Sequence, residues 1–160
     1  MTSPSSKELI AEAWRVLASR DTAAIAALFT PDAEWVAPRH NATAVALRHT
    51  DHMIGAEQIA RFIATGMRQL FTNVSIAFTG LHGDGPTVIV EERMRATLPD
   101  GRPYELDYCF VFELEDGRIR RVREYMDTLK GWHQVFGTTP PDHPMVASSS
   151  QSARMPSPGP

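Results

Sequence analysis

The first part of the chain carries apolar residues at the spacing of helices. Between Leu9 and Leu17 they recur every three or four positions, and Ser5 and Glu8 have the spacing of a capping box. A helix is therefore predicted to begin there. Asp21 has a side chain of the type that caps helices, so it predicts a short second helix after it.

The segment that follows has weaker signals. Pro31-Asp32 predicts a turn, followed by a short strand at Ala33–Ala37. Pro38–Met53 shows no regular period, so we expect a long loop there. From Ala56 to Leu70 the apolar residues return to helical spacing, which predicts a third amphipathic helix.

The second half of the chain changes to the period of strands. Strands joined by short turns are predicted at Thr72–Thr79, Thr87–Leu98, Tyr104–Glu113 and Arg118–Asp127, with a short closing helix at Leu129–Phe136. Helices first and an antiparallel meander afterwards predict an α+β fold, in which a curved sheet wraps around the helices. Such a sheet can enclose an internal apolar pocket.

Composition and charge limit the classes of function. The chain has 160 residues and a formal net charge of -3, so nothing favours nucleic-acid binding. It has no apolar stretch long enough for a membrane span and no signal core, so we expect a cytoplasmic protein that binds no membrane. Its single cysteine excludes an internal disulfide and a cysteine-based zinc cluster. We expect a folded domain over residues 1–137 and a flexible Pro/Ser-rich tail over residues 138–160.

Strand alternation sorts the side chains of the second half into faces. The aromatic face of Tyr104–Glu113 is expected to turn inward. For Thr87–Leu98 alternation leaves two choices, the face with Val88, Val90, Glu92, Met94 and Ala96 or the face with Ile89, Glu91, Arg93 and Arg95. Asp127 lies at a strand end. An inward Asp127 would stand in an apolar cavity with a raised pKa, whereas an outward one would be solvated and would cap the closing helix.

Several short motifs resemble one known family. They are Ala27-Leu28-Phe29 with Pro31-Asp32-Ala33, the run Gly55-Ala56-Glu57-Gln58-Ile59-Ala60-Arg61-Phe62, and Phe112-Glu113-Leu114-Glu115-Asp116-Gly117-Arg118-Ile119 leading into Arg123-Glu124-Tyr125-Met126-Asp127. With these the chain resembles the nuclear-transport-factor-2-like (NTF2-like) superfamily, in particular its SnoaL-like polyketide cyclase and limonene-epoxide-hydrolase-like branches. The resemblance implies a cone-shaped fold with a pocket for a small hydrophobic molecule.

The resemblance also implies which side chains face that pocket. In the epoxide hydrolase the positions of Arg93 and Asp127 point inward, which would break the tie between the two strand faces in favour of Arg93. Three other positions depart from that enzyme, because Arg95, Trp35 and Ala37 replace its second Asp, its Tyr and its Asn. The SnoaL-type cyclases rely on an acid-base Asp that Asp127 matches.

The site expected from these observations has two parts. Asp127 would move a proton, and Arg93 would orient the Asp127 carboxylate. Tyr108 would donate a hydrogen bond, and His52 is a candidate for a second acid-base group. The expected substrate-binding residues are Trp14, Trp35, Phe62, Arg95, Phe110, Phe112 and Tyr125. The loop histidines and Asp51 match no zinc motif and no Gly-rich phosphate loop occurs, so we expect no metal and no cofactor.

The expected function is cofactor-independent acid-base catalysis on a small hydrophobic molecule, such as an isomerisation, an aldol-type cyclisation or a dehydration. One alternative is an epoxide-opening hydrolase or cyclase, and another is a non-catalytic small-molecule-binding protein. A homodimer is expected through an outer sheet face that carries Val88, Val90, Met94, Cys109 and Val111.

Overall fold

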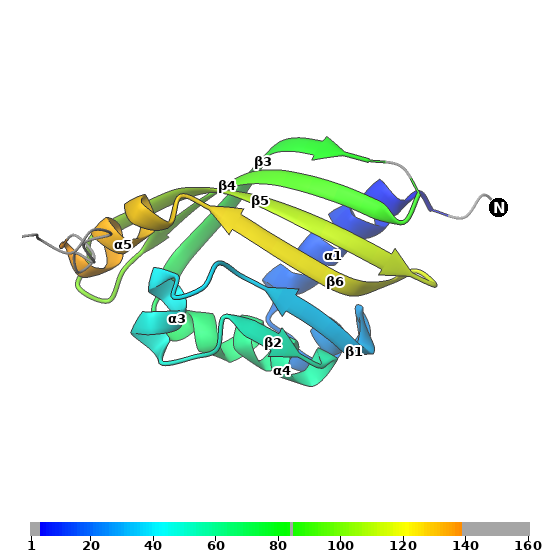
Figure 1. Cartoon of the computed structure of the whole chain (residues 1–160), viewed down its shortest axis with the longest axis horizontal. Helices are drawn as coiled ribbons and strands as arrows, with labels where there is room; N and C mark the ends of the chain where they lie inside the picture. The colour runs from blue at the N-terminus through cyan, green and yellow to red at the C-terminus, as the bar shows by residue number, and fades with distance from the viewer. Residues whose placement is uncertain (1–3, 84, 139–160) are drawn as a thin grey trace, which may run out of the picture.

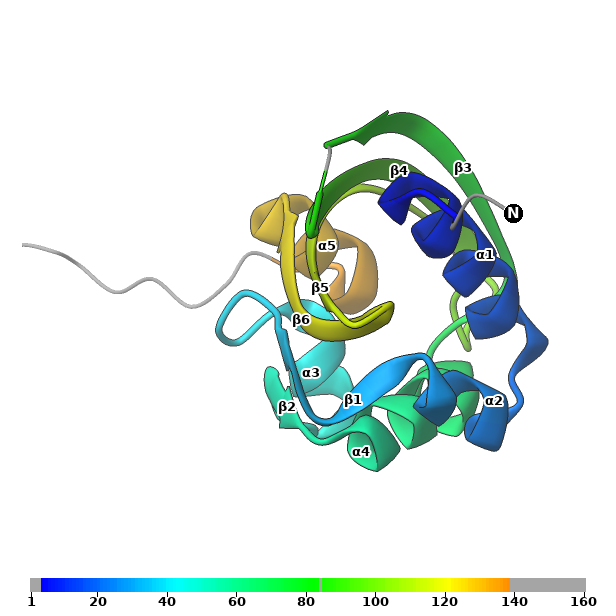
Figure 2. The same ribbon diagram turned by 90° about the vertical axis from the view of Figure 1, so that its right-hand side faces the viewer.

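The structure is a computed structural model of the whole chain, and it describes residues 4–83 and 85–138. The expected tail at 138–160 therefore lies, apart from its first residue, outside the described residues. The described part is a curled sheet whose concave side is covered by helices (Figures 1 and 2). The α+β architecture expected from the sequence is confirmed.

The first helices begin where their capping residues predict. Helix α1 (Ser6–Ser19) has the full capping box: the Ser5 hydroxyl accepts a hydrogen bond from Glu8 N at 3.3 Å, and Glu8 Oε2 accepts one from Ser5 N at 2.7 Å. Helix α2 (Thr22–Ala27) is capped by Asp21, which accepts a bond from Ala24 N at 3.0 Å.

The expected long loop contains secondary structure. Helix α3 (Ala42–Leu47) lies within Pro38–Met53, and strand β2 (His52–Ile54) begins there. Asn41 caps α3 by accepting a bond from Ala44 N at 3.0 Å. A helix of six residues is too short to display a hydrophobic period, so the loop prediction was wrong at this point.

Strand β1 and the third predicted helix also differ in detail from the expectation. Strand β1 (Phe29–Val36) begins at Phe29, before the Pro31-Asp32 turn signal, and its register shifts between Phe29 and Glu34. Helix α4 (Ala56–Arg61) continues through a π turn at Phe62–Gly66 and a 3-10 turn at Met67–Gln69. The region from Ala56 to Leu70 is thus helical but not one regular helix.

The sheet has six strands in the order β2-β1-β6-β5-β4-β3. Strands β3 (Thr72–His82), β4 (Thr87–Thr97), β5 (Pro103–Glu115) and β6 (Arg118–Met126) form the expected antiparallel meander. Strand β1 pairs with β6 in parallel, so the sheet is mixed and not wholly antiparallel. Helix α5 (Thr128–Phe136) follows β6 directly.

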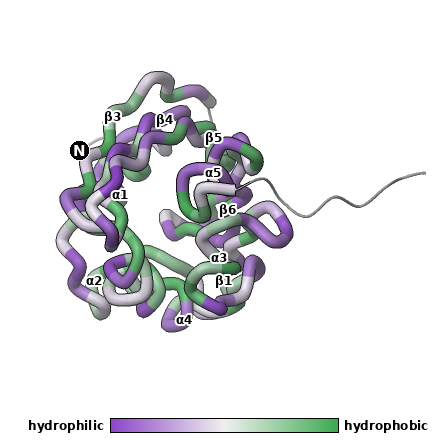
Figure 3. The backbone as a smooth tube through the Cα atoms, turned by 90° about the vertical axis from the view of Figure 1, so that its left-hand side faces the viewer, coloured by the Kyte–Doolittle hydropathy of each residue, from purple (hydrophilic) through white to green (hydrophobic). Residues whose placement is uncertain are grey.

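The core lies between the concave sheet face and helices α1, α2 and α4. In Figure 2, β3 and β4 arch over α1, and β1, α2 and α4 close the opposite side. Buried and more exposed positions alternate along β4 and β5, as expected for strands with one buried and one outward face. Figure 3 shows that the strands carry both hydrophobic and hydrophilic segments. No helix of the described residues is long and apolar enough to cross a bilayer.

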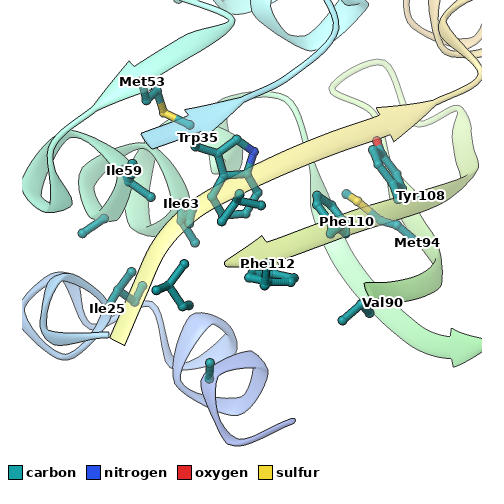
Figure 4. Close-up of a cluster of buried hydrophobic side chains, with 14 of the residues drawn as sticks. Ile25, Trp35, Met53, Ile59, Ile63, Val90, Met94, Tyr108, Phe110 and Phe112 are labelled. Atoms are coloured by element: carbon teal, nitrogen blue, oxygen red, sulfur yellow. The ribbon is translucent and has the colours of Figure 1, made fainter. Parts of the chain in front are cut away.

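Burial settles which face of β4 points inward. Val88, Val90, Glu92, Met94 and Ala96 are all buried, whereas their neighbours on the other face are half-buried or exposed. Figure 4 shows Val90 and Met94 beside the inward ring of Phe110 on β5. The face that carries Arg93 is therefore the outer one, because turning it inward would expose four apolar side chains and bury three charges.

Candidate active site

A cavity of about 140 Å³ lies between the concave sheet face and the helices. Its walls are mainly apolar and aromatic, and they include Trp14, Trp35, Met53, Phe62, Met94 and Phe110. Three polar side chains on neighbouring strands face it: Glu92 on β4, Tyr108 on β5 and Glu124 on β6. An apolar cavity with a few convergent polar groups is the usual form of a small-molecule site.

Strand register brings these three side chains to one face. Glu92 lies directly opposite Tyr108, and Phe110 lies directly opposite Glu124. The two glutamates are separated by two strand spacings and a two-residue offset, which puts their Cα atoms roughly 12 Å apart in a flat sheet. The sheet is curled (Figure 2), and both glutamates line the same cavity on its concave side.

Glu92 is a buried carboxyl group whose hydrogen bonding is incomplete. The residue is only 3% exposed, and its Oε2 has no hydrogen-bond partner among the described residues. Burial raises the pKa of Glu92 to about 8; the nearby Trp14 indole opposes this rise, and negative charge on Glu124 adds to it. Trp14 Nε1 makes no hydrogen bond of regular geometry. Glu92 is therefore suited to hold a proton near neutral pH.

Glu124 is the better hydrogen-bonded of the two carboxyl groups. Its Oε2 accepts a hydrogen bond of 2.8 Å from Trp35 Nε1. Burial raises the pKa of Glu124 to about 7, and the Trp35 bond limits the rise because it favours the charged form. The ionised form of Glu124 is thus accessible near neutral pH inside an apolar site.

Two tyrosine hydroxyls form the third polar element of the site. The hydroxyls of Tyr104 and Tyr108 lie 2.7 Å apart, and both residues are buried. Burial raises the pKa of Tyr104 to about 12 and that of Tyr108 well above 10, so both stay protonated. Tyr108 faces the cavity, whereas Tyr104 stands behind it and contacts Tyr108. The pair can therefore present one hydroxyl to a ligand.

Five of the residues expected from the sequence line the cavity: Tyr108, Trp14, Trp35, Phe62 and Phe110. Phe112 does not, because it is fully buried in the core and packs against the Trp14 ring at a centroid distance of 5.3 Å. The rings of Tyr108 and Phe110 stack at 5.6 Å, and Trp35 meets Phe110 edge-on at 5.7 Å. Figure 4 shows Trp35, Tyr108 and Phe110 around the same interior space.

Arg93 and Arg95 do not reach the cavity, and the expectation that Arg93 points inward was wrong. Arg93 lies on the outer face and makes a two-point ion pair with Asp107, at 2.7 Å from Nε and 2.9 Å from Nη2. The bonds from Arg93 hold the pKa of Asp107 below its usual range. Arg95 lies beside it on that face and pairs with Glu105 at 2.6 Å.

The expectation that Asp127 points into the pocket was also wrong. Asp127 is exposed and caps helix α5, where its Oδ1 accepts a hydrogen bond from Lys130 N at 2.9 Å. Tyr125 is 51% exposed and does not line the cavity. His52 lies on the edge strand β2, where its Nε2 is 2.9 Å from Glu34 Oε2. These three side chains lie outside the cavity because each belongs to a solvent-facing position of its element.

The sequence reasoning missed both glutamates as site residues. A usable signal was present on β4, because Glu92 is the one charged residue in the row Val88, Val90, Glu92, Met94 and Ala96. A charge within an otherwise apolar strand face is costly to bury, so it marks a functional position once that face is known to be inward. Glu124 follows Val122 on the inward face of β6 in the same way.

No group of three His, Cys, Asp or Glu residues that could hold a metal ion occurs within residues 4–83 and 85–138. The loop histidines are engaged separately. His49 packs on the Phe62 ring at 4.5 Å, and His52 pairs with Glu34.

The chain matches the SnoaL-like domain over residues 10–122, and it therefore belongs to that family. The predicted resemblance to NTF2-like and SnoaL-like proteins is confirmed. No curated protein matches the sequence significantly.

Solved structures of low sequence identity share the fold. An NTF2-like protein of unknown function from Burkholderia pseudomallei has a TM-score of 0.70 at 20% identity, covering 80% of this chain and 95% of that one. An LEH-like epoxide hydrolase from M. tuberculosis has a TM-score of 0.62 at 17% identity, covering 79% and 86%. A protein from Jannaschia sp. CCS1 that is named as a SnoaL-like polyketide cyclase has a TM-score of 0.64 at 17% identity, covering 84% of this chain and 96% of that one. Because one fold hosts many chemistries, these likenesses leave the activity to be argued from the site.

Proposed function

We propose that this protein is a cofactor-independent acid-base enzyme for a small hydrophobic molecule. The observation that carries the proposal is the pair of carboxyl groups, Glu92 and Glu124, that face one apolar cavity with raised pKa values. Carboxyl groups with pKa values near the working pH exchange protons efficiently. Isomerisation, aldol-type cyclisation and dehydration are the reactions of this kind that we consider.

The two carboxyl groups are suited to opposite roles. Glu124 accepts a bond from Trp35 that favours its ionised form, so it is the better base. The Trp14 indole near Glu92 makes no hydrogen bond of regular geometry and opposes the rise in pKa only in part, so Glu92 holds its proton to higher pH and is the better acid. For a substrate with a C–H next to a carbonyl, Glu124 would take the carbon-bound proton. Glu92 or Tyr108 would donate a hydrogen bond to the oxygen on which negative charge develops.

Cavity size limits the substrate. A cavity of about 140 Å³ is close to the roughly 150 Å³ that accommodates a benzene molecule in other proteins. A molecule of one ring therefore fits within that volume. The apolar walls strengthen hydrogen bonds and charge interactions inside the cavity, because they exclude water.

The structure supports the two alternative functions, epoxide opening and simple binding, to different degrees. Epoxide opening was favoured by an inward Arg93 and Asp127, and both lie outside the cavity, so that argument no longer supports it. A non-catalytic binding protein remains the alternative, since an apolar cavity also suits simple binding.

Hydrogen exchange into a small ketone tests the proposal. The probe is 3-cyclohexen-1-one in D2O, followed by NMR for loss of its α-hydrogens and for movement of its double bond. We expect the protein to accelerate exchange, and Glu124→Gln to slow it by roughly a hundredfold, the scale usual for such groups. Glu92→Gln should also slow the reaction.

Glu91→Gln is the matched control, because Glu91 is the neighbour of Glu92 on the exposed face of β4. It should react like the original protein. Equal rates in the original protein, Glu92→Gln and Glu124→Gln would refute the assignment of the two glutamates. Recovery of the bound ketone without exchange would favour the binding protein.

A further inference from the structure

The cavity contains more acidic than basic groups. Glu92, Glu124 and Asp51 line it with carboxyl groups, and Arg20 is its one basic residue within the described part of the chain. The Arg20 guanidinium is engaged elsewhere, since its Nη1 donates to Ile63 O at 3.0 Å. Asp51 accepts a bond from His40 N at 2.9 Å. No basic group among the described residues contributes to the pKa of Glu92 or Glu124, so the negative charge that these two glutamates can develop is not neutralised by direct pairing with Arg20.

Glu92 Oε2 is the clearest sign of a missing partner. It is buried at the cavity, it has no hydrogen-bond partner among the described residues, and Glu92 as a whole is 3% exposed. A buried carboxyl oxygen without a partner is costly. A ligand that brings a positive charge to this oxygen would remove that cost.

Aromatic rings surround the same space. Phe110 meets Trp14 edge-on at 5.5 Å and Trp35 edge-on at 5.7 Å, and it stacks with Tyr108 at 5.6 Å. The faces of aromatic rings attract cations within about 6 Å, most strongly where water is excluded. Rings and carboxyl groups in one small cavity therefore favour the same kind of ligand.

We infer that the cavity binds a compact organic cation, an alkylated ammonium group carried by the substrate, with Glu92 as its counter-charge. This inference names the substrate class for the proposed acid-base enzyme, and it rests on that proposed function. With such a substrate Glu92 is ionised, so Tyr108 and not Glu92 donates the hydrogen bond to the substrate oxygen. A bare metal ion fits less well, because the described residues offer no cluster of three ligands and the walls are apolar.

The sign of the pH dependence separates a cation from a neutral ligand. A cation favours the ionised carboxylate, so its affinity should rise as the pH increases through about 7 to 8, and protons should be released on binding. A neutral hydrogen-bond acceptor favours the protonated carboxyl group, so its affinity should fall over the same range. Tyr108, from β5, stays protonated throughout, and Arg20 stays charged.

Choline and its neutral carbon isostere, 3,3-dimethylbutan-1-ol, are the probes. They have the same shape and differ by one charge, and the charge of choline does not depend on pH. Isothermal titration calorimetry at pH 6 and pH 8.5, in two buffers of different ionisation enthalpy, measures affinity and proton release. We expect choline to bind at least tenfold more tightly at pH 8.5 than at pH 6, and more tightly than the isostere at pH 8.5.

Variants complete the test. Glu92→Gln should weaken choline binding at pH 8.5 by at least tenfold and remove most of the pH dependence, whereas Glu91→Gln on the outer face should change neither. Each of four results would overturn the inference. They are tighter binding of the isostere than of choline, a choline affinity that does not depend on pH, unchanged choline binding in Glu92→Gln, and no choline binding at millimolar concentration. Ketone exchange without choline binding would refute the cation and leave the proposed function standing. Choline binding with no exchange in any probe would refute the catalysis and leave the cation site.

Discussion

At the scale of single residues, Glu92 combines its proposed role as an acid with a cost to stability. A carboxyl group buried without a full set of hydrogen bonds lowers stability whenever it is ionised. The folded chain holds the Glu92 proton up to about pH 8, whereas the unfolded chain releases it near the ordinary value of 4.5. The contribution of Glu92 to stability is therefore most favourable below about pH 4.5 and declines as the pH rises toward 8.

Glu92→Gln should remove this decline. The shift in pKa corresponds to at most roughly 4–5 kcal/mol of stability lost at high pH. We therefore expect the difference in unfolding free energy between the variant and the original protein to grow by a few kcal/mol, in favour of the variant, from pH 5 to pH 9. Urea unfolding at both pH values measures the difference. Glu91→Gln, on the exposed face, should show no such gain. A variant whose stability follows that of the original protein at every pH would contradict the burial argument.

Trp35 limits the rise in the pKa of Glu124 that burial causes, because its indole N–H donates to the carboxylate. Trp35→Phe keeps an aromatic ring in the wall and removes the 2.8 Å bond, so the pKa of Glu124 should rise further above its ordinary value. A carbon-13 NMR titration of labelled glutamate carboxyl groups reports it. Trp132→Phe on helix α5 is the control and should leave the Glu124 titration unchanged. An unchanged or lower pKa in Trp35→Phe would show that the bond does not matter in solution.

At the scale of elements, strands β4 and β5 separate two chemistries onto two faces. Their inner face carries Glu92 and Tyr108 into the cavity, while their outer face carries the ion pairs of Arg93 with Asp107 and Arg95 with Glu105. The outer pairs are partly solvated, and such pairs contribute little to stability. The outer charges thus pair with one another on the solvent-facing side of the sheet, and the inner groups line the cavity.

The end of β6 gives a test of the same separation. Asp127→Ala should lower the free energy of unfolding by about 1 kcal/mol, because it removes the cap of α5. Asp127→Asn keeps a capping oxygen and should cost much less. Both variants should retain ketone exchange, measured at a temperature at which each is folded. A large loss of exchange in a folded Asp127→Asn protein would return Asp127 to the site.

At the scale of the whole molecule, the curl of the sheet (Figures 1 and 2) gives it a concave face, which lines the cavity, and a convex outer face. The apolar patch expected to support a homodimer is smaller than the sequence indicated. Val88, Val90 and Met94 are buried in the core, so only Cys109 and Val111 of that patch remain on the outer face, where both are half-buried.

The homodimer stays a prediction, now with a narrower basis. Sedimentation velocity at micromolar concentration should show a dimer, and Val111→Glu should weaken it by placing a charge on the outer face. Val111→Ile, which keeps the position apolar, is the control. A monomer at all these concentrations would contradict the prediction.

The sequence by itself determined the local structure and the family. Caps at Ser5 and Asp21, helical spacing and strand alternation act between near neighbours, so the main helices and the meander followed from them. The SnoaL-like class followed from the resemblance of the motifs within residues 27–33, 55–62 and 112–127 to that family. The short helix α3 was not predicted, because its six residues are too few to show a helical hydrophobic period. Alternation also sorted the residues of β4 into two sets, with Glu92 in one and Arg93 in the other.

Only the tertiary structure decided which set faces inward. Alternation is the same on both sides of a strand, and a sheet acquires an inside only when helices pack against one of its faces. The packing of α1 against β4 buried Val88, Val90 and Met94, and Glu92 went inward with them. Glu124 joined it because strand pairing across β5 brings distant parts of the chain to one cavity. Arg93 and Asp127 remained outside because each has polar partners there. Arg93 pairs with Asp107 in contact with solvent, and Asp127 accepts a hydrogen bond at the start of helix α5.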